Sequence, residues 1–540
     1  MAVTGPVMQP AAGTAPLLPE TRASLYDRWR MRVAADPRLT RRWGWLAPLI
    51  VTLLAGILRL WNLGHPHAFV FDETYYVKDA WTQWALGYAA MWPPEGANEA
   101  FLAGDTDVFT TSGSFVVHPP LGKLLIGAGM ALFGADSSFG WRIATALIGT
   151  ATVLLLYVVA RSMTGSIAFA TVAALLMAID GLAIVMSRVA LLDNFLTFFL
   201  LLAFWFVLLD RRTHLDRLAA LVAERRGDGQ PPAWGPVLWN RPWVLAAGAA
   251  AGAATAVKWS GLYVIAGIGV YLVVTDALAR RRAGVRIWPA DAAFRQGAAT
   301  FLLFVPIALV VYLSSWIGWL STDGGYARQS AIEEPVTGFW SWVPPALQSL
   351  WIYHRAIYDF HVGLTAAHGY ASPAWQWPLL LRPTSMYYQA TPQGQAGCTA
   401  PNGCVENIYS MPNPLIWYAG VAAVLYLAYR FVRARDWRFA FVLTGIAVTY
   451  VPWLLYPERT VFQFYTIAIL PFVLLGLTFA LRDIAGASHT DRTRRTSGQR
   501  VVLVFLLVAV ALSAFWYPVL TATPVPYFFW QAHNWMLSWI

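Results

Sequence analysis

The chain has 540 residues, of which 58% are hydrophobic and only 12% are charged, and its mean hydropathy of +0.51 excludes an ordinary soluble globular protein. A formal charge of +10 could favour nucleic acid, but the basic residues form short clusters between apolar runs rather than along one soluble face. The composition predicts an all-α polytopic membrane protein with no nucleic-acid partner, in which basic clusters mark the cytoplasmic loops.

The N-terminal stretch 1–42 is polar and lacks the short apolar core and cleavage site of a signal peptide. We interpret it as a cytoplasmic tail, so the first apolar run, at roughly 43–61, crosses the membrane outward. The next stretch, 62–141, holds eight acidic residues and two lysines, which is the reverse of the cytoplasmic pattern. It is predicted to be the first outer loop, with a re-entrant or interfacial helix at 121–134.

The remainder of the chain alternates between apolar runs and basic segments such as "ARRRAGVR" and "RFVRARDWR". A second long polar region, 317–414, is predicted to be another outer loop. With the first span, these runs predict about 11 transmembrane helices in a single domain, 43–540, with the C-terminus outside the cytoplasm. The further spans are expected near 141–159, 167–186, 194–209, 243–257, 259–275, 297–316, 415–429, 439–456, 461–481 and 501–517.

The only two cysteines, Cys398 and Cys404, flank "TAPNG" in the second outer loop. An oxidising compartment and a turn signal between the two thiols favour a disulfide, and the alternative is two unrelated free thiols. The sequence shows no internal repeat, no nucleotide-binding glycine motif and no Cys/His cluster with metal-ligand spacing.

The candidate functional residues gather on the predicted outer side of the membrane. Charges at membrane depth are costly unless they are paired or face a wet cavity, so their common level predicts a cavity there. The alternative explanation for any single cation is that its long side chain extends to the membrane–water interface and has no role in a site. Cations suit a phosphate group, and aromatic rings suit a sugar face or a lipid chain. The set comprises Arg59, Asp72, Glu73, His118, Lys123, Arg142, Arg188, Asp193, Lys258, Glu458, Arg459, Gln463 and Tyr465.

Four segments in this order and spacing resemble the protein O-mannosyltransferase family of membrane glycosyltransferases with the GT-C fold. They are "FVFDETYYVKDAW", "HPPLGKLLIGAGMALFG" followed by "GWRIATALIG", "SRVALLDNFLTFF" and "AVKWSGLY", and the later "YHRAIYDFH" and "WPLLLRP" agree. The chain is most similar to the bacterial branch, because it has no counterpart of the MIR domain that eukaryotic members insert in the second outer loop. The resemblance covers nearly the whole chain.

The resemblance implies an inverting enzyme of the cytoplasmic membrane that moves mannose from polyprenyl-phosphate-mannose to Ser or Thr hydroxyls of proteins. The acceptors are expected outside the cytoplasm, with the secretion translocon as an expected partner. Asp72 is the predicted base, since a carboxylate is already ionised at neutral pH. By resemblance Glu73 orients Arg59 or the acceptor, and Arg142 supports the loop or the phosphate.

The other site residues have roles that depend on their predicted depth. Lys258 and Arg459 are expected to hold the donor phosphate, with supporting roles for His118, Lys123, Asp193 and Glu458. Further along, His354, Tyr358 and His361 recur on one face of a predicted juxtamembrane helix and are acceptor or loop candidates. Their spacing could mimic a metal site, but no carboxylate completes it, so a packed amphipathic helix is favoured. No cofactor is firmly predicted, and a divalent cation has no support from the residues.

Two other functions compete with this prediction. A related GT-C enzyme could transfer the sugar to a lipid or polysaccharide rather than a protein. A transporter would instead use charges near the bilayer centre to couple ion and substrate movement. It would require matched broken helices in two repeated halves, whereas these charges lie towards one face and no repeat is visible.

Overall fold

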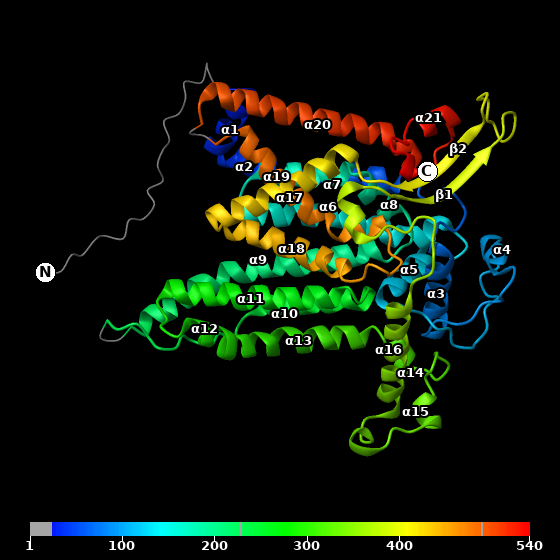
Figure 1. Ribbon diagram of the computed structural model, residues 1–540, viewed down its shortest axis with the longest axis horizontal. Coiled ribbons are helices and arrows are strands. Elements are labelled where there is room, and N and C mark those ends of the chain that lie inside the picture. Colours follow the sequence, from blue (N-terminus) through cyan, green and yellow to red (C-terminus); the bar gives the residue numbers. More distant parts are fainter. Residues whose placement is uncertain (1–23, 227–228, 488–489) are drawn as a thin grey trace.

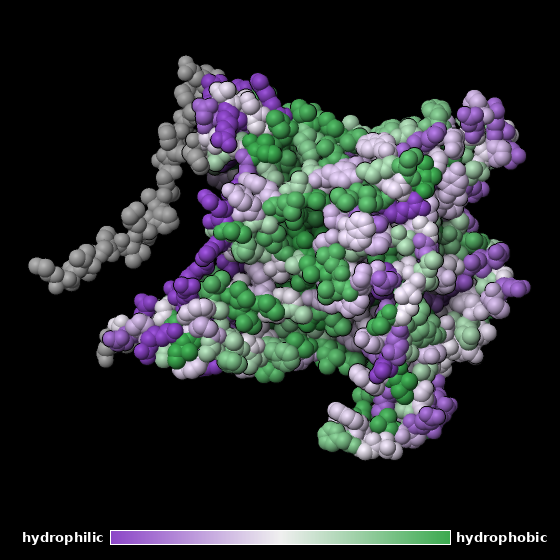
Figure 2. All heavy atoms as spheres, in the orientation of Figure 1, coloured by the Kyte–Doolittle hydropathy of each residue, from purple (hydrophilic) through white to green (hydrophobic). Residues whose placement is uncertain are grey.

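The computed structural model describes residues 24–226, 229–487 and 490–540 as a bundle of long helices that run along one direction (Figure 1). Short helices and a small sheet gather at one end of the bundle, and α1 (Leu25–Ala35) lies at the other. Hydrophobic residues cover the middle of the visible face, and hydrophilic residues concentrate at its two ends (Figure 2). This distribution is that of a membrane protein.

Within the described residues, eight helical stretches are long and apolar enough to cross a membrane. All eight coincide with predicted spans. Seven of them are single helices: α2 (Pro37–Leu60), α6 (Ser138–Thr164), α9 (Asp193–Glu224), α11 (Gly261–Ala283), α17 (Pro414–Ala434), α18 (Trp437–Leu454) and α20 (Arg492–Leu520). The eighth is the continuous stretch Trp288–Ser314, which consists of α12 (Trp288–Ala290), the π-helix η2 (Asp291–Gln296) and α13 (Gly297–Ser314).

The other three predicted spans correspond to helices that do not reach this length alone. One is a pair, α7 (Ile167–Ile179) and α8 (Gly181–Arg188), bent by 60° at Asp180. Asp180 causes the break locally, because its carboxylate accepts a hydrogen bond from the backbone N–H of Ala183 and caps α8. The remaining two, α10 (Pro242–Val257) and α19 (Leu470–Ala485), have 16 residues each. The predicted number of about 11 spans is therefore not confirmed, since length and hydropathy support eight or nine.

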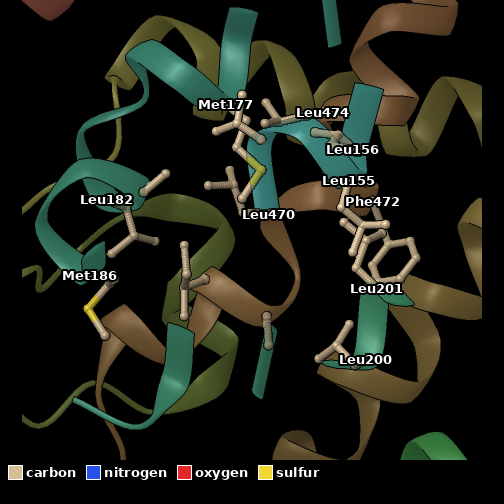
Figure 3. Packing of buried hydrophobic residues seen from close by; sticks show 14 of the residues in the cluster. Leu155, Leu156, Met177, Leu182, Met186, Leu200, Leu201, Leu470, Phe472 and Leu474 are labelled. Atoms are coloured by element: carbon tan, nitrogen blue, oxygen red, sulfur yellow. The ribbon is translucent and has the colours of Figure 1, made fainter. Parts of the chain in front are cut away.

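A continuous hydrophobic core joins the broken pair to the centre of the bundle. Side chains of α6, α7, α8 and α9 interlock there with those of α19 (Figure 3). Although short, α19 is buried along most of its length, so it passes through the protein rather than along its lipid-facing surface. Helix length is therefore a poor criterion for a membrane span here. A helix that is surrounded by protein does not have to match the thickness of the hydrocarbon layer.

The crowded end is built from the two predicted outer loops. The first loop contributes α3 (Glu73–Leu86), α4 (Ala97–Leu102) and α5 (Leu121–Phe133), and α5 is the predicted helix at 121–134. The second contributes α16 (Pro345–Gly363), which is the predicted juxtamembrane helix. The same end contains the shorter elements α14 (Ile317–Ser321), α15 (Ser330–Glu333), η3 (Gly338–Trp340), η4 (Ala374–Leu379), η5 (Gln463–Ala468), α21 (Tyr527–Gln531) and η6 (Leu537–Trp539).

A small antiparallel sheet was not predicted. Strand β1 (Thr384–Thr391) pairs with β2 (Cys404–Ser410), which pairs in turn with β3 (Val525–Pro526). The predicted disulfide between Cys398 and Cys404 is confirmed, and it closes the loop of this hairpin. The prediction of an all-α fold is thus right for the membrane bundle and omits one small sheet at the end formed by the two predicted outer loops.

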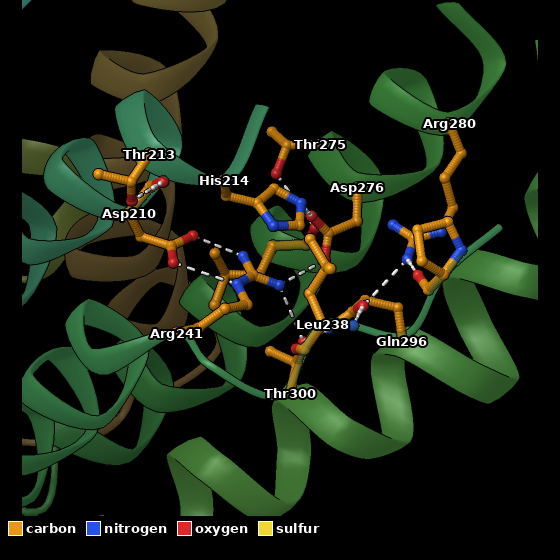
Figure 4. Close-up of polar contacts among 12 residues, drawn as sticks. Asp210, Thr213, His214, Leu238, Arg241, Thr275, Asp276, Arg280, Gln296 and Thr300 are labelled. Carbon is orange, nitrogen blue, oxygen red and sulfur yellow. Dashed lines mark hydrogen bonds and ion pairs between the residues drawn. The ribbon is translucent and has the colours of Figure 1, made fainter. Parts of the chain in front are cut away.

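A network of buried polar and charged side chains joins α9, α11 and α13 around Arg241 (Figure 4). The Arg241 guanidinium, just before α10, donates to both oxygens of Asp210 on α9 at 3.1 and 2.5 Å. It also donates to Asp276 on α11 at 2.8 Å and to Thr300 on α13 at 3.2 Å. One side chain therefore links four helices, and its charge is compensated by two carboxylates.

Candidate active site

The Asp-Glu pair of the first loop marks the start of α3. Asp72 is the residue before this helix and Glu73 is its first residue. The preceding residue, Phe71, has φ +52°, a left-handed backbone conformation that costs free energy for a bulky side chain. The Phe71 ring is held edge-on against Phe462 and Phe464, with centroids 5.3 and 5.6 Å apart. These contacts offset the strain and fix the turn that presents Asp72.

Glu73 is fully buried and forms a two-pronged ion pair with Arg142 on α6, with both N–O distances at 2.8 Å. The same carboxylate accepts hydrogen bonds from the backbone N–H groups of Val70 and Ala190, each at 2.8 Å. Arg142 also donates to the carbonyl oxygen of Pro66 at 2.8 Å. The pair therefore joins the first loop to α6 and to the segment between α8 and α9, and it acts as a scaffold for Asp72.

Of the two roles predicted for Glu73, orienting Arg59 or the acceptor, the first is wrong, because both carboxylate oxygens bind Arg142. Arg59 is fully buried and instead donates to the carbonyl oxygens of Met177 and Ala178 at 3.1 Å each. These carbonyls lie at the end of α7, where the bend leaves backbone acceptors without a partner in the next turn. Arg59 stabilises the broken helix and has no contact with Asp72.

Asp72 faces a group of polar side chains from four elements. Lys258, in the turn between α10 and α11, forms an ion pair with Asp193 at 2.8 Å, and its ammonium lies 4.8 Å from the Tyr465 ring centre. Burial raises the pKa of Asp72 to about 6, and nearby Asp193 acts in the same direction. Lys258 and the Tyr76 hydroxyl oppose that rise because they favour the ionised form.

Beside this group lie two histidines and an arginine. The rings of His118 and His361 are 5.3 Å apart, and Arg459 donates to the carbonyl oxygen of His361 at 3.1 Å and lies 3.0 Å from its ring Nδ1. Burial holds the pKa of His118 well below its ordinary value, and burial together with Arg459 lowers the pKa of His361 to about 4. Both rings are therefore neutral near pH 7, and the charges here are those of Arg459 and Lys258.

The remaining predicted residues are not all brought together. Lys123 on α5 pairs with Asp79 on α3 at 3.6 Å and so holds the two outer helices together. The Glu458 side chain is exposed and makes no hydrogen bond or ion pair with any residue that the structure describes. On α16, His354 lies 2.6 Å from the Tyr312 hydroxyl, whereas Tyr358 is exposed.

The row His354, Tyr358 and His361 consequently forms no common site, and only His361 lies next to the Asp72 group. No three His, Cys, Asp or Glu side chains gather as a metal-binding group in the described ranges of the chain. Tyr465 belongs to the residues that the sequence placed on the outer side, whereas Tyr76 was not singled out. Tyr76 follows Asp72 by one helical turn, so its place on the same face could have been read from "DETYY".

This polytopic helical bundle, with a carboxylate, cations and aromatic rings gathered at one end, has the GT-C fold of membrane glycosyltransferases. The sequence model described as dolichyl-phosphate-mannose-protein mannosyltransferase matches residues 49–317, and that described as the C-terminal four TMM region of protein-O-mannosyltransferase matches residues 346–539. The chain belongs to the protein O-mannosyltransferase family.

Relatives similar along nearly their whole length support this assignment. A polyprenol-phosphate-mannose–protein mannosyltransferase of Mycolicibacterium smegmatis is 34% identical over 514 residues, covering 93% of this chain and 94% of the relative. A protein of the same description from Mycobacterium tuberculosis is 32% identical over 541 residues, covering 98% and 96%.

Solved structures share the fold at low sequence identity. The protein O-mannosyltransferase Pmt1–Pmt2 complex of S. cerevisiae, solved with its sugar donor, superimposes with a TM-score of 0.67 at 16% identity, covering 92% of each chain. The archaeal oligosaccharyltransferase AglB of Archaeoglobus fulgidus gives 0.50 at 16% identity, covering 92% of this chain and 58% of the other. These likenesses establish the common GT-C architecture.

Proposed function

We propose that this protein transfers mannose from a polyprenyl-phosphate-mannose donor to Ser or Thr hydroxyls of polypeptides, with Asp72 as the general base. The observation that carries the proposal is the half-buried carboxylate of Asp72 beside Lys258, within a chain of the mannosyltransferase family. The acceptors are polypeptides on the outer side of the cytoplasmic membrane, supplied by the secretion translocon.

The transfer is a direct displacement at the anomeric carbon. The acceptor oxygen loses its proton to Asp72 as it bonds to the anomeric carbon, and the bond from that carbon to the phosphate oxygen breaks. The electron pair of the broken bond leaves with the lipid phosphate, so the configuration of the sugar inverts. With a pKa raised to about 6, Asp72 is a stronger base than an ordinary carboxylate and is still ionised near pH 7. Glu73 acts as a positioning residue through Arg142.

The departing phosphate needs compensation of charge rather than a proton. Lys258 acts directly on the Asp72 carboxylate, and Arg459 lies against His361 beside this group, so both cations suit this role. Their neighbours His118 and His361 are neutral. Lys258 is already paired with Asp193 at 2.8 Å, which holds the ammonium in place while leaving donors for a phosphate oxygen. Arg459 contributes a planar group that can grip two oxygens at once.

The decisive test is to determine which acceptor receives the mannose. Purified protein is incubated with labelled polyprenyl-phosphate-mannose and either a Ser/Thr-rich peptide or extracted membrane lipids. We expect label in the peptide, lost on mild base treatment that eliminates O-linked sugars. Label in the lipid fraction alone would establish the related lipid-glycosylating function, and movement of the donor across vesicles without transfer would establish a transporter.

The proposed orientation has an independent test. The basic segment 211–229, which contains the end of α9, and the acidic loop near α4 predict opposite sides of the membrane. In a variant with both native cysteines replaced, a new cysteine at position 219 should react only with permeant reagents. One at position 105 should react with impermeant reagents applied to whole cells. The reverse pattern would place Asp72 in the cytoplasm and remove secreted polypeptides as acceptors.

The raised pKa of Asp72 predicts the pH dependence of transfer. A base works only when deprotonated, so the rate should be nearly constant above pH 7 and fall about tenfold per pH unit well below pH 6. An unperturbed carboxylate would delay this fall to about pH 4. Initial rates between pH 4.5 and 8 decide between the two, with thermal stability measured at each pH. A flat profile down to pH 5 would contradict the assignment.

A further inference from the structure

A cavity lies on α9 far from Asp72. It has a volume of about 360 Å³ and lies between the end of α6, the middle of α9 and the start of α18. Arg211 is 18 residues beyond Asp193 on α9, and a rise of 1.5 Å per residue puts it about 27 Å away along the helix. The lining residues are Ser162, Leu208, Arg211, Arg212, Leu215, Asp216 and Trp437.

The lining combines a cationic side with an apolar side. The Arg211 guanidinium lies over the Trp437 ring at 4.3 Å, which orients it. Within residues 24–226, 229–487 and 490–540, Arg211 donates no side-chain hydrogen bond, so its fork of donors has no acceptor there. Arg212 donates to the carbonyl oxygen of Ser162 at 2.5 Å, which anchors it to the end of α6. Leu208 and Leu215 complete the wall.

The acidic groups nearby do not cancel this charge. Asp216 lies on the lining but is exposed to solvent. Asp436, just before Trp437, is engaged by the Arg438 guanidinium at 3.0 Å and caps α18. Two arginines therefore face one exposed carboxylate at the level where α6 ends and α18 begins. A tryptophan at such a level is typical of the interface between membrane and water.

We propose that this cavity binds the phosphate headgroup of an anionic phospholipid in the leaflet opposite the active site. The phosphate oxygens would accept hydrogen bonds from Arg211 and Arg212, and the lipid's glycerol and first acyl carbons would lie against Leu208 and Leu215. A soluble phosphate has no apolar part to use this wall, which is why we commit to a lipid. The bound lipid would fasten α6, α9 and α18 together where they leave the membrane.

The test measures lipid retention by the full chain purified in mild detergent. Native mass spectrometry with phosphatidylglycerol or phosphatidylcholine gives the fraction of protein carrying lipid at each concentration. We expect phosphatidylglycerol to bind at least tenfold more tightly than phosphatidylcholine, and the combined Arg211→Gln and Arg212→Gln change to remove that preference. The matched control is Arg225→Gln with Arg226→Gln, another adjacent pair on the same chain segment, in which Arg226 donates to the Ala283 carbonyl oxygen at 3.0 Å.

Milder variants and a competition experiment complete the test. If the double variant is unstable, Arg211→Lys and Trp437→Leu each keep part of the site and should lower affinity about threefold to tenfold. Glycerol phosphate should fail to compete with phosphatidylglycerol, and full competition would overturn the lipid in favour of a soluble phosphate ligand. Equal retention by wild type and the Arg211/Arg212 variant, or equal loss in the Arg225/Arg226 control, would also overturn the proposal.

Discussion

Replacing Asp72 by Asn is expected to slow mannose transfer by about 10²–10⁴-fold, because an amide keeps the size of the side chain but cannot accept the acceptor's proton. Folding should be unaffected, since Asp72 makes no ion pair that the described structure depends on. Donor affinity should also survive, because the proposed phosphate contacts belong to Lys258 and Arg459. The measurement is the initial transfer rate at saturating peptide, with donor binding determined separately.

The matched control for this variant is Asp105→Asn, an exposed carboxylate in the same loop. It should keep full activity. A well-folded Asp72→Asn protein with near-normal transfer would sink the assignment of the base. Glu73 is not a ready substitute, because both of its oxygens are held by Arg142 and by backbone N–H groups.

Replacing Glu73 by Gln is expected to destabilise the protein by about 3–5 kcal/mol, because it leaves the Arg142 charge buried and unpaired. Activity should fall together with stability. This is the opposite of Asp72→Asn, which should lose activity alone. The measurement is the thermal midpoint in detergent at a fixed scan rate, compared with Glu95→Gln, an exposed acid in the same loop.

A second variant separates charge from packing at this position. Combining Glu73→Gln with Arg142→Met removes both charges and should recover part of the lost stability, as expected when a buried ion pair is replaced by an apolar side chain. Catalysis should remain weak, because the loop that presents Asp72 would still lack its link to α6. A Glu73→Gln protein as stable as wild type would show that the pair is not a scaffold.

The membrane bundle was largely predictable because hydropathy and length are properties of single helices. Every predicted apolar run coincides with a helix, and eight satisfy the criterion for a span. The exceptions are helices whose environment is protein. α19 is buried on most sides, and the pair α7–α8 breaks where Asp180 offers a cap. Neither fact follows from hydropathy, since both depend on which neighbours the helix meets.

The sequence predicted most of the residues that form the site, but not which of them pair with one another. The positions of Asp72, Lys258 and Arg459 relative to the predicted spans placed all three at one end of the bundle. The family resemblance indicated the importance of the Asp-Glu pair. The sequence could not show that Glu73 pairs with Arg142 rather than with Arg59, because both arginines were predicted at the outer ends of spans. Tyr465 was expected on the outer side, but its contact with Lys258 could not be predicted, since the ring reaches the ammonium only through the packing of η5. The small sheet was missed because the hairpin of β1 and β2 lies inside a long polar region that was interpreted only as an outer loop, and its third strand has two residues.

The Arg241 network has a consequence for how the chain is made. Its partners Asp210, Asp276 and Thr300 belong to helices that leave the ribosome at different times, and Thr300 comes 59 residues after Arg241. While α13 is still unsynthesised, the cluster lacks one wall and stays open to the water or headgroups around it. Membrane insertion of α9, α10 and α11 must therefore tolerate a half-finished charge cluster. A chain truncated before α13 would leave this charged cluster exposed, and quality-control proteases could recognise the exposed cluster. In the full-length protein α13 covers it.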